Sequence, residues 1–288
     1  MSNAVWQIYT HDKSPGEHTV VGSVRIAPQI HSPQLGNRRD ILVYLPPSYH
    51  VSEKYYPVVY MHDGQNLFDE VTSFVGEWRV DETLEEIAHS EGYEAIVVGI
   101  PSVGEERMLE YSPYDTRWGK SKAAQYLAFM TETVKPLVDS SFRTLPGRST
   151  TGVAGSSMGG LISMYAFMRC PQVFGWVGAM SPSFWLVNHH IIHDIEQMPY
   201  IPGRIYLDIG EQEISSRRAG KSQQLTSTVR QVYEALVVRG YQPNREILYV
   251  TDPEGVHHES AWARRFPQMI RFFLSPQPEQ VLQQPPNS

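Results

Sequence analysis

A serine flanked by glycines lies near the middle of the sequence. Residues 155–159 read Gly-Ser-Ser-Met-Gly and match the Gly-x-Ser-x-Gly pattern of a nucleophile elbow. In an elbow the serine hydroxyl projects from a sharp turn, because the glycines let neighbouring backbone pass close by. The pattern predicts Ser157 as a nucleophile. It also predicts that the amide of Met158, at the start of the next helix, helps to stabilise an oxyanion.

The segments on either side of this motif favour the same interpretation. Residues 149–154 are short, partly β-branched and apolar, which predicts a strand, and residues 161–168 have the spacing of a helix. An elbow differs from a chance Gly/Ser turn because a strand precedes the turn and a helix follows it.

A serine nucleophile needs a general base and an acid that orients the base. After a nucleophile elbow the chain order is serine, then acid, then histidine, so the base comes last. The histidines after Ser157 are His189, His190, His193, His257 and His258. The last two follow the final predicted strand, at the end of a parallel sheet where ligands bind. One of the pair is therefore expected to be the base, and the residues alone do not choose between them.

The predicted acid comes from the segment after the seventh strand. Residues 208–213 read Asp-Ile-Gly-Glu-Gln-Glu, and Glu213 lies just past the strand, where the acid is expected. Asp208 lies inside the strand and would need partners of its own if buried. Glu211 and Asp252 remain as alternatives.

The loop at 62–66 is expected to supply the second oxyanion donor. It reads His-Asp-Gly-Gln-Asn, and Gly64 and Gln65 are the two candidates. The histidines of the 188–193 segment are interpreted as one face of a helix, and the His-Asp pair of the loop as a turn, because neither belongs to a convincing ligand cluster. No metal and no cofactor are predicted.

Strands and helices alternate through most of the chain. This alternation predicts an α/β fold with a mostly parallel, eight-stranded sheet, in which the first two strands are antiparallel because no helix joins them. A single domain over 1–274 is expected, followed by a disordered Pro/Gln-rich tail at 275–288. The predicted strands are 20–26, 40–45, 58–61, 95–100, 149–154, 175–180, 204–209 and 246–250, and the predicted helices are 81–89, 122–138, 161–168, 222–238 and 260–274.

Composition narrows the range of partners. The 288 residues carry a net charge of -7 without a basic block, so nucleic acid is not an expected partner. No apolar run is long enough to span a membrane, and no secretory signal is visible at the start. With a single cysteine as well, the expected location is cytoplasmic.

Several stretches between residues 40 and 274 together resemble one family. They are 43–49, 57–68, 78–81, 107–113, 155–160, 181–185 and 255–262. The chain resembles the Putative esterase family of α/β-hydrolases, which is similar to esterase D, enterochelin-type siderophore esterases and feruloyl esterases. The resemblance implies a single-domain α/β-hydrolase fold.

The resemblance also implies site residues. The family's histidine lies five positions before a tryptophan, which here selects His257 with Trp262, and its acid falls in a Gly-x-x-Asp/Glu turn, which selects Glu213. The residues considered for the substrate pocket are Arg107, Tyr111, Trp118, Phe184 and Trp185. Residues 115–120 depart from the glycine-rich run of relatives, a difference expected to affect the pocket rather than the chemistry.

The expected function is that of a serine carboxylic-ester hydrolase. It would act on a small-molecule ester through an acyl-enzyme on Ser157, with His257 as general base and Glu213 as the orienting acid. Acyl transfer and thioester hydrolysis use the same triad and remain alternatives. A catalytically inactive binding module on the same fold is a third.

Overall fold

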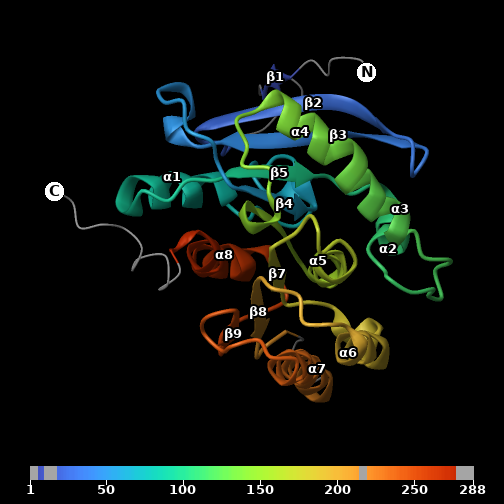
Figure 1. The fold of residues 1–288 in the computed structure, drawn as a ribbon. Coiled ribbons are helices and arrows are strands. Elements are labelled where there is room, and N and C mark those ends of the chain that lie inside the picture. Colours follow the sequence, from blue (N-terminus) through green and yellow to red (C-terminus); the bar gives the residue numbers. More distant parts are fainter. Residues whose placement is uncertain (1–5, 10–17, 214–218, 277–288) are drawn as a thin grey trace.

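The computed structural model describes residues 6–9, 18–213 and 219–276. Within them one nine-stranded sheet has the order β1-β2-β3-β5-β4-β6-β7-β8-β9 (Figure 1). The strands are β1 (Gln7–Ile8), β2 (Ser23–Ser32), β3 (Asn37–Leu45), β4 (Val58–His62), β5 (Ile96–Ile100), β6 (Thr151–Ser156), β7 (Trp176–Met180), β8 (Arg204–Gly210) and β9 (Ile247–Asp252). The predicted tail lies outside the described residues from 277 onward.

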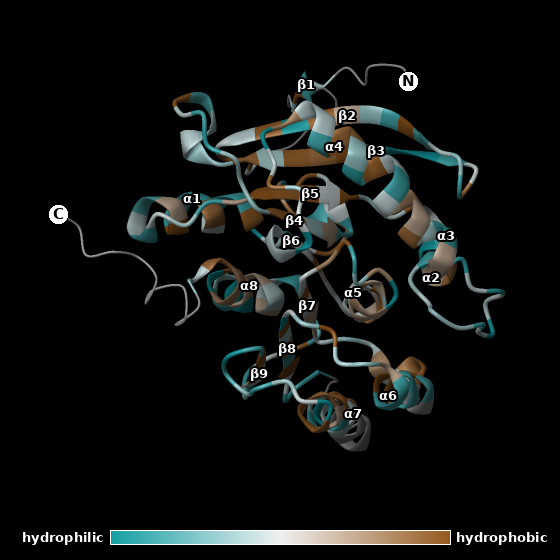
Figure 2. Cartoon of the chain, viewed as in Figure 1, coloured by the Kyte–Doolittle hydropathy of each residue, from teal (hydrophilic) through white to brown (hydrophobic). Residues whose placement is uncertain are grey.

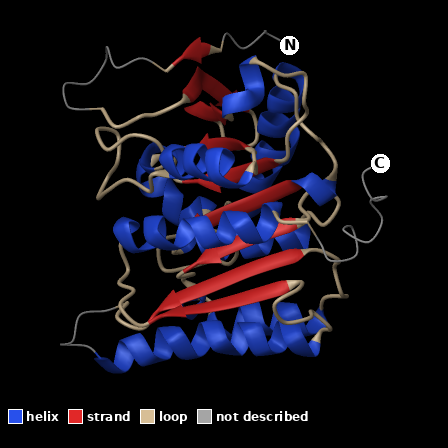
Figure 3. Ribbon diagram, turned by 90° about the vertical axis from the view of Figure 1, so that its left-hand side faces the viewer, coloured by secondary structure: helices blue, strands red, loops and turns tan. Residues whose placement is uncertain are grey.

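The predicted α/β fold is confirmed. The eight expected strands are β2 to β9, and the two-residue β1 adds an edge strand where the sequence shows no clear pattern. β2 and β3 are antiparallel, as expected, and β3 also runs antiparallel to β5. From β5 through β4 and on to β9 every pairing is parallel, and Figure 3 shows these strands lying side by side between layers of helices.

Helices cover both faces of the sheet. α1 (Val80–Glu91) and α8 (Glu259–Leu274) lie together on one face (Figure 1). The helices on the other face are α3 (Ala123–Ala128), α4 (Lys135–Ser141), α5 (Met158–Arg169), α6 (Asn188–Gln197) and α7 (Ala219–Val238). The predicted helix over 122–138 is α3 and α4 joined by a π-helical stretch, Phe129–Val134, and a short α2 (Arg107–Glu110) precedes it.

Two hydrophobic cores result, one on each side of the sheet. Val59, Leu84 and Phe266 belong to the core under α1 and α8, whereas Val98 and Leu161 belong to the core on the opposite face. Every residue of the central strands β4, β5 and β7 is buried, because helices cover both of their faces, and Figure 2 shows brown, apolar segments in the middle of the sheet. Burying each such large apolar side chain stabilises the fold by about 1.5–3 kcal/mol.

The parallel register brings several strand ends to one edge of the sheet. β4 ends at His62, β6 at Ser156, β8 at Gly210 and β9 at Asp252. Parallel strands all present their carboxyl ends at the same edge, so the loops that follow these strands lie next to one another there. None of the described helices is long and apolar enough to cross a membrane.

Candidate active site

Ser157 occupies a strained turn between β6 and α5. Its φ is 55° and its ψ is -120°, a conformation that residues with a side chain rarely adopt. Its N–H donates to the Met180 carbonyl at 2.9 Å, and its own carbonyl accepts from the Leu161 N–H at 3.1 Å, so the flanking elements hold the turn in place. The strain presents the hydroxyl at the carboxyl edge of the sheet.

Close backbone contacts around the turn explain its glycines. A Cβ at Gly155 would lie 3.0 Å from both the Gly159 carbonyl carbon and His62 Cδ2. A Cβ at Gly64 would lie 2.6 Å from the Ile100 nitrogen, too close for any side chain. The elbow and the loop after β4 therefore approach their neighbours as only glycine allows.

Three residues predicted from separate parts of the sequence meet at this edge. His257 Nε2 lies 2.9 Å from Ser157 Oγ, and His257 Nδ1 is hydrogen-bonded to Glu213 Oε2. The Glu213 side chain is fully buried, whereas that of His257 is 33% exposed. With Nδ1–H donating to the carboxylate, Nε2 is free to accept the serine proton.

Glu213 is held as a carboxylate by several donors. Its Oε1 accepts from Ser181 Oγ at 2.6 Å and from the Gly210 N–H at 2.7 Å. Burial pushes the pKa of Glu213 upward, but hydrogen bonding and charge from His257, together with these two donors, outweigh burial and leave the pKa below its usual value.

Ser181 connects the acid to α8, a role that sequence analysis missed. Its Oγ accepts from Trp262 Nε1 at 3.0 Å and from Arg265 Nη2 at 2.8 Å. With both acceptor positions used, the hydroxyl proton is directed at Glu213. The sequence placed Ser181 only within a family motif, and its positive φ of 40° is not visible from residue type.

Ser183 is a second residue that sequence reasoning did not assign. Its Oγ lies 3.1 Å from Ser157 Oγ, and its N–H donates to the Ser157 carbonyl at 2.9 Å. It follows β7 rather than β6, so only the fold brings it next to the nucleophile.

The other candidate acids have different partners. Asp208 is buried, accepts from the Ser181 N–H at 2.9 Å and lies 3.2 Å from Arg265 Nε; burial raises its pKa to about 6. Asp252 pairs with Arg264, and Glu211 is exposed. The structure thus places Glu213 against His257.

His258 contacts its own helix instead of the serine. Its Nδ1 accepts from the Ser260 N–H at 3.2 Å as the N-cap of α8. Trp262, one turn further on, meets the His257 ring edge-on at 5.1 Å. The spacing between His257 and Trp262 therefore reflects a ring contact at the start of α8.

The two expected sources of oxyanion donors lie beside the elbow. Met158 is the first residue of α5, so its amide is outside the helical ladder. In the turn Gly64–Asn66, the first internal bond runs from the Asn66 N–H to the Asp63 carbonyl at 2.9 Å. The Asp63 N–H donates to Tyr111 Oη at 3.2 Å, which leaves Gly64 and Gln65 as the two candidates.

The residues expected to line the substrate pocket differ in exposure. Tyr111 and Phe184 are fully buried, so they can shape a pocket only from behind. Trp118 and Trp185 are exposed, and Trp185 follows Ser183 by two positions. Arg107 is partly exposed and binds both carboxylate oxygens of Asp63 at 2.8 Å.

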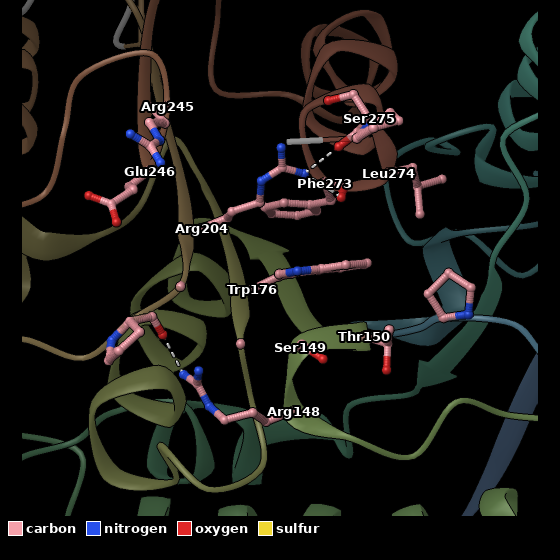
Figure 4. Close-up of a pocket in the computed structure, with 15 residues that line it drawn as sticks. Arg148, Ser149, Thr150, Trp176, Arg204, Arg245, Glu246, Phe273, Leu274 and Ser275 are labelled. Atoms are coloured by element: carbon pink, nitrogen blue, oxygen red, sulfur yellow. Dashed lines mark hydrogen bonds between the residues drawn. The ribbon is translucent and has the colours of Figure 1, made fainter. Parts of the chain in front are cut away.

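Two other features are separate from the contacts among Ser157, His257 and Glu213. On α6, His190 stacks on Tyr114, and the His189 side chain is outside the described residues. A cavity of about 680 Å³ opens at the amino ends of the strands, where Trp176, Arg204 and Phe273 line it (Figure 4). It contains none of the predicted site residues.

The sequence matches one protein family over most of its length. The sequence model of the family described as "Putative esterase" matches residues 32–273. The chain belongs to this family. It is a carboxylic-ester hydrolase, as the resemblance implied.

Proteins similar to the esterase occur in bacteria and in a fungus. It is 28% identical over 239 residues to uncharacterized protein YbbA of Bacillus subtilis, covering 80% of this chain and 90% of that protein. It is 34% identical over 105 residues to an iron(III) enterobactin esterase of Dickeya dadantii, which is 34% of this chain and 24% of that protein. The fold is similar to that of an IroE-like serine hydrolase from Shewanella oneidensis, with a TM-score of 0.68, 19% identity, and coverage of 87% of this chain and 80% of that one.

Proposed function

We propose that the esterase hydrolyses small-molecule carboxylic esters through an acyl-enzyme on Ser157. The observation that carries this proposal is the chain of contacts from Ser157 Oγ to His257 Nε2, at 2.9 Å, and from His257 Nδ1 to Glu213. A serine whose proton can pass to a histidine oriented by a buried carboxylate is an activated nucleophile.

The reaction proceeds in two halves. Ser157 Oγ attacks the ester carbonyl carbon while His257 Nε2 takes the hydroxyl proton, and the resulting imidazolium is stabilised by Glu213. His257 then gives that proton to the departing alkoxide, so an alcohol leaves and an acyl-enzyme remains. In the second half His257 takes a proton from water while the water oxygen attacks the acyl carbon. His257 then returns that proton to Ser157 Oγ as the acyl–oxygen bond breaks, so the carboxylic acid is released and the free serine is restored.

The negative oxygen of each tetrahedral intermediate would bind backbone amides. We assign one donor to Met158, whose amide lies at the N-terminus of α5, where the helix dipole also favours negative charge. The second donor would be Gly64 or Gln65, whose amides are the first of their turn. Loss of one such donor typically costs about a hundredfold or more in kcat.

We propose a class of substrates, small-molecule carboxylic esters, rather than a single compound. The loop that carries Trp185 and the Arg107–Asp63 pair flank the elbow and the turn after β4, so they would contact the ester. One relative is an iron(III) enterobactin esterase, so ester-linked siderophores belong in a substrate screen together with aryl and alkyl esters.

Replacing the nucleophile is the direct test. We expect Ser157→Ala to abolish p-nitrophenyl acetate hydrolysis, with kcat reduced by several orders of magnitude, because no hydroxyl remains to be acylated. A fluorophosphonate should label the native protein on the peptide that contains Ser157 and leave the variant unlabelled. Ser149→Ala, at the opposite edge of the sheet, is the matched control and should behave as the native protein. Equal turnover by Ser157→Ala with an unchanged circular dichroism spectrum would refute the proposal.

A further inference from the structure

Three carboxylates gather where the N-terminal segment meets the start of α1. Glu77, Asp81 and Glu82 each place one ligand oxygen within 4.8 Å of the other two. Asp81 is 0% exposed and Glu77 is 7% exposed, whereas Glu82 lies at the rim. A group of carboxylates in water is ordinary, but buried ones need compensation.

Each carboxylate of this acidic trio uses only one of its oxygens within the protein. Asp81 Oδ2 accepts from the Val21 N–H at 2.8 Å, and Glu77 Oε2 accepts from Thr19 Oγ1 at 2.8 Å. The other oxygens, Asp81 Oδ1, Glu77 Oε1 and Glu82 Oε2, are buried without a hydrogen-bond partner among the described residues. Helix-dipole attraction accounts for acids at the start of α1, but it supplies no partner for these oxygens.

The surrounding charge does not neutralise the trio. Besides Glu82, the carboxylates of Glu70 and Asp69 act on Glu77 with further negative charge. Among the described ion pairs, the cation on the trio is Arg79, which lies 3.3 Å from Glu82 and is 65% exposed, so water screens it. The local excess of negative charge calls for a positive group at the centre.

We propose that Glu77, Asp81 and Glu82 bind a divalent cation, and specifically Ca²⁺. Carboxylate oxygens are hard ligands, and Ca²⁺ accepts them in flexible geometry at about 2.3–2.6 Å. Two oxygens on the same Ca²⁺ can therefore lie up to about 5 Å apart, so three oxygens that all lie within 4.8 Å of one another can share one ion. Mg²⁺ needs tighter, near-octahedral ligands and retains its water, so it fits this trio less well.

The ion would join separate segments of the chain. Thr19 and Val21 already contact the trio, and Trp78, next to Glu77, donates its N–H to the Asn66 carbonyl at 2.8 Å. Asn66 ends the turn that supplies Gly64 and Gln65. The cation thus stabilises the support of the oxyanion turn, and it touches none of the reacting atoms.

The test measures binding directly. After treatment with a chelator, Tb³⁺ should give luminescence sensitised through neighbouring Trp78, and Ca²⁺ should displace it. Ca²⁺ should also raise the Tm of the native protein by a few degrees when it is present about a hundredfold above Kd. Chelation should lower the Tm and leave kcat unchanged at temperatures well below unfolding.

Amino-acid substitutions test whether the cation binds at the acidic trio. In Asp81→Asn the Tb³⁺ signal and the Ca²⁺ shift should be lost, while the ion-free variant should stay folded, because its side-chain oxygen can still accept from the Val21 N–H. Glu86→Gln makes the same change at an exposed site on α1 and should respond to Ca²⁺ as the native protein does. If Asp81→Asn does not fold, Glu77→Gln serves in its place.

Three results would overturn the proposal. One is a native Tm and Tb³⁺ signal that do not respond to Ca²⁺ up to about 10 mM. A second is an Asp81→Asn variant that still responds like the native protein. The third is a Tm that depends on pH but on no cation, which would show that the trio shares protons instead. In addition, a response to Mg²⁺ but not to Ca²⁺ would overturn the choice of Ca²⁺.

Discussion

Two adjacent histidines at the start of α8 have different surroundings. His257 lies between Ser157 and Glu213, whereas His258 turns toward Ser260 and caps the helix. Neighbouring residues on extended backbone point in opposite directions, so only one of the two can face the serine. The two histidines should therefore differ in their effects on kcat and on the free energy of unfolding.

Separate substitutions should divide catalysis from stability. We expect His257→Ala to lose several orders of magnitude in kcat, nearly as much as Ser157→Ala, and Glu213→Ala to lose less. His258→Ala should retain kcat and lose about 1 kcal/mol of unfolding free energy, because an N-cap acceptor is removed. Steady-state kinetics and urea unfolding give the two readouts. A dead His258→Ala beside an active His257→Ala would reverse the assignment, and a fully active Glu213→Ala would move the acid to Asp208 or Asp252.

Ser181 should influence catalysis through the position of Glu213. A hydrogen bond to a charged group contributes about 1.5–3 kcal/mol, so Ser181→Ala is expected to lower kcat about tenfold or more with little change in KM. Thr151→Val is the matched control: it also removes a buried hydroxyl, one that donates to the Gly147 carbonyl at the other edge of the sheet. A kcat loss of equal size in both variants would indicate a general packing effect rather than positioning.

Among the secondary-structure elements, β4 supports the site most directly. Its last residue, His62, is buried, its Nδ1 lies 2.8 Å from the Tyr126 hydroxyl, and its ring lies against the elbow glycines. Burial lowers the pKa of His62 to about 3, with neighbouring Arg107 lowering it further and Asp63 opposing. A neutral imidazole is therefore built into the wall behind the nucleophile.

This lowered pKa predicts how stability depends on pH. Between pH 6.5 and 3 the unfolded chain binds a proton on His62 that the folded protein does not, so the free energy of unfolding falls as pH decreases. The slope from this residue is about 1.4 kcal/mol per pH unit. His62→Gln should be less stable at pH 7 through lost packing, and its deficit should shrink by about 3 kcal/mol on going to pH 4.

Urea unfolding at several pH values checks this expectation. His31→Gln, which changes an exposed histidine on β2, should keep the native pH dependence. A deficit for His62→Gln that stays constant from pH 7 to pH 4 would show that His62 titrates in the folded protein as it does in the unfolded chain.

The two edges of the sheet are separate environments. The predicted nucleophile, base and acid follow β6, β9 and β8 at the carboxyl edge, whereas the cavity around Trp176 and Arg204 opens at the amino edge (Figure 4). Helix layers on both faces leave the strand ends as the accessible parts of the sheet (Figure 3). The geometry of the candidate site is therefore a consequence of the fold and of parallel register.

Local patterns in the sequence determined the elements and the main candidates. Runs of apolar residues identify buried strands because both faces of each strand are covered, and Gly-x-Ser-x-Gly identifies Ser157 because the turn needs glycine on both sides of it. The predicted boundaries differ by a few residues, as for β6, which is shifted from the expected 149–154 to Thr151–Ser156. The start of α5 at Met158 can also be predicted from the neighbouring residues, because the helix begins directly after the elbow turn.

Which distant side chains meet depends on how the elements pack in the folded protein. Glu213 and Asp208 are both acids near the end of one strand, yet Glu213 bonds His257 and Asp208 pairs with Arg265. Asp208 lies within β8, whereas Glu213 lies beyond the end of β8 and folds back to accept from the Gly210 N–H. No spacing pattern in the sequence identifies Ser181 or the trio of Glu77, Asp81 and Glu82. Their roles depend on partners far along the chain, such as Trp262 and Val21, and such contacts exist only after the sheet and α8 have packed.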